Sequence, residues 1–321
     1  MKAILQSRYG PPAEALQIKE VEIPVPKDDQ ALVRVHASSV NPADWYLIRG
    51  KPFLVRLAGS GFLRPRSALT GSDVAGTVTA VGKVVREIRP GAEVLGICSG
   101  AFAEHVTVPE STLVEKPARL SFEQAAAVPL AGMTALQALR THGKVQPGQK
   151  VLVHGASGGV GTFAVQIAKA LGAEVTAVCS TSKVDLARSL GADYVLDYTK
   201  EDFAKRELRY DLVLIVNGSR PVRDYRRVLN PGGACILIGG SIGQVLRFLI
   251  FGRFYRNSPK GKVLTFVMKP NRQDLLFLKG LLEGGKLNPV MDRNFSFASV
   301  PEALEYLHEG HAKGKISITV G

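Results

Sequence analysis

Apolar and polar positions alternate along much of the first third of the chain. Residues 31–37, 76–82 and 103–108 keep this period of two, and a turn at Pro90-Gly91 leads into another apolar stretch that ends at Gly96. Alternation of this kind, bounded by glycine and proline, is typical of half-buried strands. The pattern therefore predicts a β-rich domain over residues 1 to about 120. Residues 52–70 mix large apolar side chains with arginines and are expected to form a long surface loop, a flap.

The pattern changes at Ser121. Ser121 stands three residues before Gln124, which is the spacing of a helix-capping pair, and alanine-rich segments extend to about residue 139. Short apolar runs then alternate with segments whose apolar residues recur at the spacing of a helix. This alternation predicts a doubly wound parallel sheet. The expected strands of this sheet are residues 151–153, 174–178, 194–196, 212–216, 234–238 and 263–267.

In the last 50 residues the pattern of apolar and polar positions changes again. Their pattern predicts helices at 273–282 and 300–308, an extended segment at 288–297 and a closing strand at 316–320. We expect this segment to rejoin the first domain, so that the parallel sheet is an insertion. The predicted domains are residues 1–120 with 269–321, and residues 121–268.

The strand at 151–153 continues into a glycine-rich turn and then into an amphipathic helix. Its spacing, Ala156-x-Gly158-x-x-Gly161, is that of a dinucleotide-binding fingerprint with alanine at the first position. A strand, a glycine turn and a helix N-terminus direct backbone N–H groups and the positive end of the helix dipole to one point, which suits a pyrophosphate. The predicted cofactor residues here are Ala156, Ser157, Gly158, Gly159, Val160 and Gly161.

Composition narrows the class of protein. The chain has 321 residues, of which 45% are hydrophobic and 21% charged, as expected for a globular protein with two domains. Its three cysteines lie far apart, which argues against a disulfide framework and favours a reducing, cytoplasmic compartment. The first residues have no signal-like apolar core, and no apolar run is long enough to cross a membrane.

The chain is strongly basic. It carries 41 lysines and arginines against 28 acidic residues, a net charge of +13, which favours anionic ligands. These charges are dispersed, so no specific nucleic-acid site is predicted. Residues 242–257 combine large apolar side chains with arginines. This segment is interpreted either as a cover for a substrate pocket or a subunit contact, or as a surface that lies on an anionic membrane.

Four stretches together resemble one protein family. They are V-N-P-A-D-W-Y at 40–46, G-S-D-V-A-G at 71–76, H-G-A-S-G-G-V-G at 154–161 and G-H-A-K-G-K at 310–315. In this order and spacing they resemble medium-chain dehydrogenase/reductases of the zinc-free quinone oxidoreductase branch. The resemblance implies a Rossmann domain inserted in a GroES-like catalytic domain, and a homodimer.

The resemblance also bears on zinc. Zinc-using relatives carry cysteine, histidine and glutamate at the positions of Asn41, Ser72 and Asp73. Asparagine and serine are poor zinc ligands, and residues 125–139, where a third ligand would be expected, contain neither cysteine nor histidine. No metal is therefore expected.

The end of the second parallel strand indicates which nicotinamide cofactor is bound. An NAD site would place an acidic residue near Cys179, whereas this chain has hydroxyl side chains followed by Lys183. In the family that it resembles, residues at the positions of Lys183 and Tyr198 hold the 2′-phosphate of NADPH, and a residue at the position of Thr134 lies near the nicotinamide. The predicted NADPH site also includes Ser180, Asn217 and Gly239.

Without zinc, bound NADPH can reduce an acceptor that conjugation already activates, such as a quinone or an α,β-unsaturated carbonyl. By resemblance, Asn41, Asp44 and Tyr46 form the catalytic site, with an amide or phenol donor for the developing enolate and Tyr46 as proton donor. Asp44 is equally interpreted as a structural residue of a turn. Two other functions stay open: a zinc-free NAD(P)-dependent alcohol or aldehyde dehydrogenase, and an NADPH-binding scaffold of low turnover at a membrane or nucleic-acid surface.

Overall fold

The computed structural model describes residues 1–53, 56, 61–65, 67–218, 220–240, 242–255, 258 and 261–321. Parts of two predicted segments, the loop at 52–70 and the end of the segment at 242–257, lie outside these residues. The chain forms two compact units. The first contains Met1–Ala131, Pro270–Glu283 and Pro289–Gly321, and the second contains Gly132–Lys269 with Gly284–Asn288.

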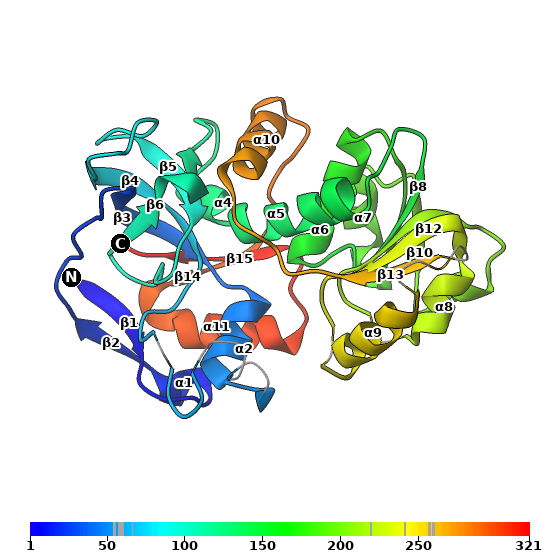
Figure 1. Cartoon of the computed structure of the whole chain (residues 1–321), viewed down its shortest axis with the longest axis horizontal. Coiled ribbons are helices and arrows are strands. Elements are labelled where there is room, and N and C mark those ends of the chain that lie inside the picture. The colour runs from blue at the N-terminus through cyan, green and yellow to red at the C-terminus, as the bar shows by residue number, and fades with distance from the viewer. Residues whose placement is uncertain are drawn as a thin grey trace. The chain divides into compact units, whose positions relative to one another are not determined.

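The first unit is built on a seven-stranded sheet in the order β14-β15-β3-β4-β5-β7, with β6 paired to β3 (Figure 1). Strands β14 and β15 run parallel, and the other pairs are antiparallel. A separate antiparallel pair is formed by β1 and β2. The strands are β1 (Lys2–Gln6), β2 (Leu16–Glu20), β3 (Gln30–Ser39), β4 (Asp73–Val81), β5 (Glu93–Ile97), β6 (His105–Pro109), β7 (Leu113–Glu115), β14 (Met291–Ser296) and β15 (Lys315–Thr319).

Alternation along β3 explains why this sheet has a core. Ala31, Val33, Val35 and Ala37 are buried, and Arg34 between them is exposed. Ala31, Val33 and Val35 pack with residues of other elements into one hydrophobic cluster. The helices and helical turns of this unit are α1 (Pro12–Ala15), α2 (Pro42–Arg49), η2 (Glu110–Thr112), α4 (Phe122–Ala126), α10 (Arg272–Glu283), η6 (Phe297–Ser299) and α11 (Val300–Glu309).

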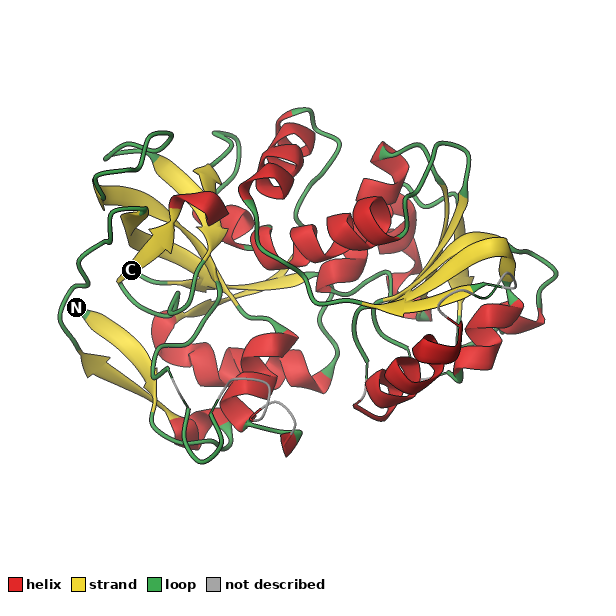
Figure 2. Cartoon of the chain, viewed as in Figure 1, coloured by secondary structure: helices red, strands yellow, loops and turns green. Residues whose placement is uncertain are grey.

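The second unit is a parallel sheet of six strands in the order β10-β9-β8-β11-β12-β13. Helices α6 and α7 cover one face of this sheet, and α8 and α9 cover the other (Figure 2). The strands are β8 (Lys150–His154), β9 (Glu174–Cys179), β10 (Tyr194–Asp197), β11 (Tyr210–Ile215), β12 (Leu229–Leu237) and β13 (Lys262–Thr265). The helices are η3 (Gln137–His142), α6 (Gly159–Ala170), η4 (Thr181–Lys183), α7 (Val184–Ser189), η5 (Phe203–Lys205), α8 (Val222–Arg227) and α9 (Ile242–Tyr255).

Helix α5 (Pro129–Leu136) begins in the first unit and continues into the second. The strand order reverses direction between β8 and β11, and in doubly wound sheets ligands bind at such a switch point. The predicted fold class, a parallel doubly wound sheet inserted in a β-rich domain, is confirmed.

Most predicted elements are found within a few residues of their expected ends. Ser121 caps α4 together with Gln124, as its spacing predicted. Two details differ from the expectation: residues 137–142 form a π-helical turn, and β12 begins at Leu229, five residues before the predicted strand. Among the described residues, no helix has the length and apolar character that a membrane span requires.

Candidate active site and cofactor cradle

The N-terminus of α2 holds two of the predicted catalytic residues. Asn41 precedes the helix in extended conformation, and Asp44 lies in the first turn. One carboxylate oxygen of Asp44 accepts a hydrogen bond from the backbone N–H of Asn41 at 2.9 Å. The other accepts one from the Ser72 hydroxyl, also at 2.9 Å. An acidic side chain in this position satisfies a free N–H group of the helix, so Asp44 has a structural role here.

Asp44 is buried, and its environment disfavours the ionised form. Burial and the nearby charge of Asp73 raise its pKa to about 6, against the hydrogen bonds from Ser72 and Asn41 and the charge of Lys315. A carboxyl group with such a pKa carries a proton part of the time near neutral pH. It is therefore suited to donate a proton as well as to cap the helix.

The Asn41 side chain lies between two buried charged groups. Its amide nitrogen donates to Asp73 Oδ2 at 2.9 Å, and its amide oxygen accepts from Lys315 Nζ at 2.6 Å. Asp73 is fully buried and also accepts from the Ser39 hydroxyl at 2.6 Å and from the backbone N–H of Leu130 at 2.8 Å. Both ends of the Asn41 amide are thus engaged within this cluster of buried polar side chains.

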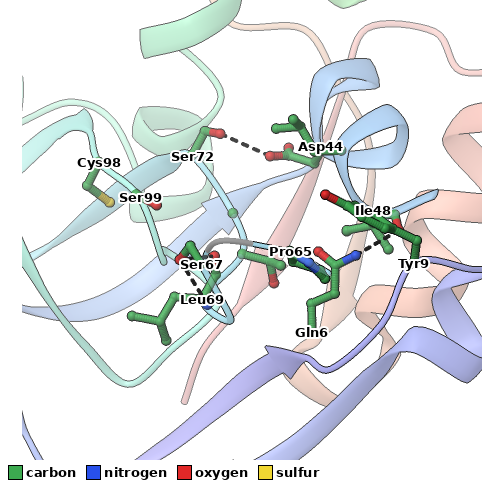
Figure 3. Close-up of a pocket in the computed structure, with 13 residues that line it drawn as sticks. Gln6, Tyr9, Asp44, Ile48, Pro65, Ser67, Leu69, Ser72, Cys98 and Ser99 are labelled. Atoms are coloured by element: carbon green, nitrogen blue, oxygen red, sulfur yellow. Dashed lines mark hydrogen bonds between the residues drawn. The ribbon is translucent and has the colours of Figure 1, made fainter. Parts of the chain in front are cut away.

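A cavity of about 280 Å³ opens beside Asp44 (Figure 3). Figure 3 shows the Asp44–Ser72 hydrogen bond at its wall, with Cys98 and Ser99 near Ser72. Burial raises the pKa of the Cys98 thiol, so this thiol stays protonated. The cavity is lined by Gln6, Tyr9, Asp44, Leu47, Ile48, Pro65, Ser67, Leu69, Thr70, Gly71, Ser72, Cys98 and Ser99. Its mixture of apolar side chains with a few hydroxyls suits a small organic molecule.

Tyr46, the third predicted catalytic residue, lies on α2 two residues after Asp44 but is not among the described residues that line this cavity. Its ring meets Trp45 edge to face, with centroids 5.3 Å apart. The structure therefore brings Asn41 and Asp44 together and places Tyr46 beside them against the core.

The glycine turn of the second unit forms a cradle at the start of α6. A Cβ atom on Gly161 would lie 2.1 Å from the carbonyl oxygen of Gly155, so only glycine fits there. A Cβ atom on Gly158 would have no described neighbour closer than 3.8 Å, so the space over this residue is open to a ligand. The left-handed backbone of the turn falls on Gly155, which explains why alanine is tolerated at position 156. This geometry fits a pyrophosphate.

The other predicted cofactor residues are distributed around the same edge of the sheet, except Thr134 on α5. Ser180 and Lys183 follow β9, and Tyr198 follows β10 with its side chain exposed. Asn217 and Gly239 follow β11 and β12. Because the carboxyl ends of parallel strands meet at one edge, these residues lie at the same edge of the sheet as the cradle.

Two polar contacts at this edge were not predicted. Asp197, the last residue of β10, accepts hydrogen bonds from the hydroxyls of Thr181 at 2.5 Å and Thr199 at 2.7 Å. Its carboxylate is therefore directed at the loop after β9. The position of Asp197 next to Tyr198, at a strand end, was a usable signal in the sequence.

The second contact joins His154 and Tyr225, whose Nδ1 and hydroxyl are 2.9 Å apart. Burial and the charge of Arg220 lower the pKa of His154 to about 4, so this histidine is neutral. A Cβ atom on Gly218 would lie 2.3 Å from the Tyr225 hydroxyl, so the pair also requires glycine in the loop after β11.

Comparison with known proteins gives matches over the whole chain. Residues 27–118 match the alcohol dehydrogenase GroES-like domain, and residues 190–318 match the zinc-binding dehydrogenase domain. The chain is 34% identical to the NADPH-dependent alkenal/one oxidoreductase of Arabidopsis thaliana, covering 99% of this chain and 79% of that protein. It is 32% identical to the chloroplast envelope quinone oxidoreductase homolog of the same plant, covering 99% and 98%. Its fold matches the quinone oxidoreductase from Coxiella burnetii with a TM-score of 0.86, at 29% identity over 100% of this chain and 99% of that one.

The name of one matching domain raises the question of zinc. The side chain of Asn41 is engaged by Lys315 and Asp73, and the Ser72 hydroxyl donates to Asp44. A divalent cation at Asn41 would meet the Lys315 ammonium, which lies 2.6 Å from the amide oxygen. Within the part of the chain that the structure describes, no three His, Cys, Asp or Glu side chains gather to hold a metal. The donor set therefore does not fit a catalytic zinc ion.

Proposed function

This chain belongs to the medium-chain dehydrogenase/reductase family and is an oxidoreductase; we propose that it reduces quinones or α,β-unsaturated carbonyls with NADPH, without zinc. The observation that carries the proposal is the Asp44–Ser72 pair at the wall of a partly apolar cavity, beside a cluster whose donors do not suit a metal. Relatives named as quinone oxidoreductase and alkenal/one oxidoreductase support the substrate class.

In this proposal the cradle holds NADPH. Residues 156–161 bind the pyrophosphate, and Ser180, Lys183 and Tyr198 bind the 2′-phosphate. A lysine and hydroxyl groups stabilise a phosphate, and the one carboxylate described at the loop after β9, Asp197, is held by the hydroxyls of Thr181 and Thr199. Thr134, Asn217 and Gly239 complete the site. The chemistry that NADPH supplies when bound is hydride transfer.

The residues of the first unit orient the acceptor and supply a proton. The apolar wall of the cavity receives the ring or alkene of the acceptor and reduces its contact with water. The Ser72 hydroxyl and a protonated Asp44 stabilise charge on the acceptor oxygen, and Asp44 delivers the proton through Ser72. Asn41 supports Asp44 with its backbone N–H. Tyr46 is the second proposed proton donor.

The assembly and location of the protein also belong to the proposal. We propose that residues 1–120 and 269–321 form the catalytic domain and residues 121–268 the NADPH domain, in a cytoplasmic homodimer. Among the described strands β13 is the last of its sheet, and an edge strand of this kind can pair with a second copy of the chain. Contact of residues 242–257 with a membrane surface is proposed as a peripheral association, since Leu246, Ile250 and Phe254 are exposed on α9.

The test is oxidation of NADPH and NADH by purified, chelator-treated protein with a panel of quinones, enones and simple aldehydes. We expect turnover with NADPH on quinones or enones, and none on aldehydes, since an unactivated carbonyl needs a stronger acid or a metal. Turnover on aldehydes would favour the alcohol dehydrogenase alternative. Binding of NADPH without turnover on any acceptor would favour a scaffold.

Lys183→Glu tests the choice of cofactor. Because the variant puts a carboxylate beside the 2′-phosphate, we expect KM for NADPH to rise about tenfold or more while KM for NADH changes little. Lys205→Glu, which makes the same charge change elsewhere in the second unit, serves as the control. Equal effects of the two variants on NADPH would remove Lys183 from the phosphate site.

Tyr46→Phe tests the second proton donor. The phenol is lost while the ring and its contact with Trp45 are retained, so we expect kcat to fall about tenfold or more with NADPH affinity within twofold. An unchanged kcat would leave Asp44 as the proton donor of the proposal.

A further inference from the structure

Lys315 is a buried lysine that the mechanism above does not use. It is the first residue of β15, and only 3% of its surface is exposed. Its ammonium lies 2.6 Å from the amide oxygen of Asn41, 3.4 Å from the carbonyl oxygen of Val40 and 3.5 Å from Asp73 Oδ2. Burial lowers the pKa of Lys315, and the charges of Asp73 and Asp44 oppose this effect. Transferring an ammonium group from water to the protein interior costs free energy, which a counter-ion offsets only in part. We therefore expect the buried Lys315 to have a function.

The contacts of Lys315 fix the orientation of the Asn41 amide. The amide oxygen faces the ammonium, and the amide nitrogen faces the Asp73 carboxylate. If the amide turned over, its NH2 group would face a cation that can only donate, and its oxygen would face a carboxylate that can only accept. The two buried charges therefore select one orientation of Asn41.

Two further hydrogen bonds connect Asn41 to the side chains that line the cavity. The backbone N–H of Asn41 donates to Asp44, and Ser72 donates to the other oxygen of the same carboxylate. Asp44 and Ser72 both line the cavity. A continuous path of hydrogen bonds and one short stretch of backbone thus joins the buried ammonium to the proposed proton donor.

We propose that Lys315 is a positioning residue of the reductase, whose ammonium is the fixed cation of the site and acts on Asp44 through Asn41. It contacts Asn41 and Asp73, which by the resemblance stand where zinc-using relatives carry cysteine and glutamate. In this protein the ammonium of Lys315 supplies the positive charge beside Asn41 and Asp73 that a metal ion would otherwise supply. It holds the polar groups in position but contacts no substrate. The inference rests on the proposed function, because it assigns Lys315 a part in that reaction.

A purely structural role is the alternative, since Lys315 also ties β15 to the residues before α2. Lys116 offers a matched control. It is a second buried lysine of the first unit, with 4% of its side chain exposed, paired with Glu93 at 3.1 Å and donating to the Leu120 carbonyl at 2.7 Å. Lys116 does not line the cavity. Its loss should affect stability alone.

The experiment compares Lys315→Arg, the double variant Lys315→Met/Asp73→Asn and Lys116→Met with the wild type. The double variant removes both buried charges together, so no unpaired ion is left in the core. For each protein, thermal unfolding, NADPH binding by fluorescence titration, and kcat and KM for a quinone that the wild type reduces are measured.

We expect the double variant to bind NADPH within twofold of the wild type and to lose kcat about tenfold or more, because misplaced proton donors slow the chemical step. Lys315→Arg keeps the charge with a different shape, and its kcat should lie between those of the double variant and the wild type. Lys116→Met should unfold at a lower temperature with kcat unchanged.

A folded double variant with the kcat of the wild type would overturn the inference and leave the proposed function intact. If the double variant does not fold, Lys315→Gln decides, because it keeps a hydrogen-bond donor for Asn41 but removes the charge; an unchanged kcat in that variant overturns the inference. A wild type that reduces neither quinones nor enones would instead refute the proposed function, which is a different result from any of these.

Discussion

The two candidate sites of this molecule are built in different ways. The cradle of the second unit is made from backbone, by seven consecutive residues from Gly155 to Gly161. The buried cluster of the first unit is made from side chains, and its members, Asn41, Asp73 and Lys315, come from distant parts of the chain. The cradle depends on the absence of side chains, whereas the cluster depends on a balance of buried charges. Substitutions should therefore disrupt the two sites in different ways, sterically in one and electrostatically in the other.

The largest effect is expected for Gly161→Ala. The added methyl group would lie 2.1 Å from the Gly155 carbonyl oxygen, and backbone atoms must move to admit it. We expect a loss of about 4 kcal/mol or more in the free energy of unfolding, measured by urea denaturation.

Gly158→Ala is the matched control for this substitution, because its methyl group would have no described neighbour within 3.8 Å. This variant should unfold like the wild type but bind NADPH about tenfold more weakly, because the methyl group occupies the space of the pyrophosphate. Equal stability of the two alanine variants would contradict the steric account of the cradle.

Asp73→Asn tests the electrostatic account of the cluster. The variant leaves the ammonium of Lys315 buried without a carboxylate partner, although most hydrogen bonds can be retained. Removing one partner of a buried ion pair destabilises proteins by about 3–5 kcal/mol, and we expect a loss of that order in the free energy of unfolding.

Asp185→Asn breaks an ion pair with Arg188 at the surface, where the Asp185 side chain is 97% exposed, and should change the stability by less than about 1 kcal/mol. Similar losses in the two variants would mean that the buried pair contributes no more than an exposed one.

A smaller effect than for Asp73→Asn is expected for Asp44→Asn, and it depends on pH. The pKa of Asp44 rises from 3.8 to about 6 on folding, so the folded state binds this proton more tightly than the unfolded chain. The stabilisation from this group is complete below pH 4 and is lost as the pH rises through about 6. Asparagine resembles the protonated acid at every pH. The variant should therefore gain about 3 kcal/mol over the wild type at pH 8 and little at pH 4, measured by urea denaturation.

Activity gives the second readout for Asp44. If its protonated form donates to the acceptor, kcat of the wild type should fall as the pH rises above about 6. The Asp44→Asn variant should have a lower kcat without this dependence. Asp292→Asn, at a carboxylate that accepts from Tyr306, is the control and should keep the wild-type profile. A wild-type profile that is flat between pH 5 and 8 would argue that Asp44 has only its capping role.

The sequence by itself determined the elements and the cradle. Strands in both units follow from local patterns of period two or from short apolar runs, and Ser121 and Gln124 mark the start of a helix three residues apart. The glycine turn is largely local, because the close contacts of Gly158 and Gly161 are with residues within a few positions, although Gly155 also packs against Asn217. Signals of this kind are visible in a window of a dozen residues.

Only the tertiary structure decided which side chains meet. The sequence pointed to Asn41 and Asp44, but Lys315, separated from Asn41 by most of the chain, joins them through the pairing of β15 with β3. In the same way Asp197 reaches Thr181 because the parallel strands β9 and β10 end side by side, and His154 at the end of β8 reaches Tyr225 on helix α8. A buried ion pair has no period and no fixed spacing along the chain. Its partners are set by the order of strands in the sheet, which long-range packing determines.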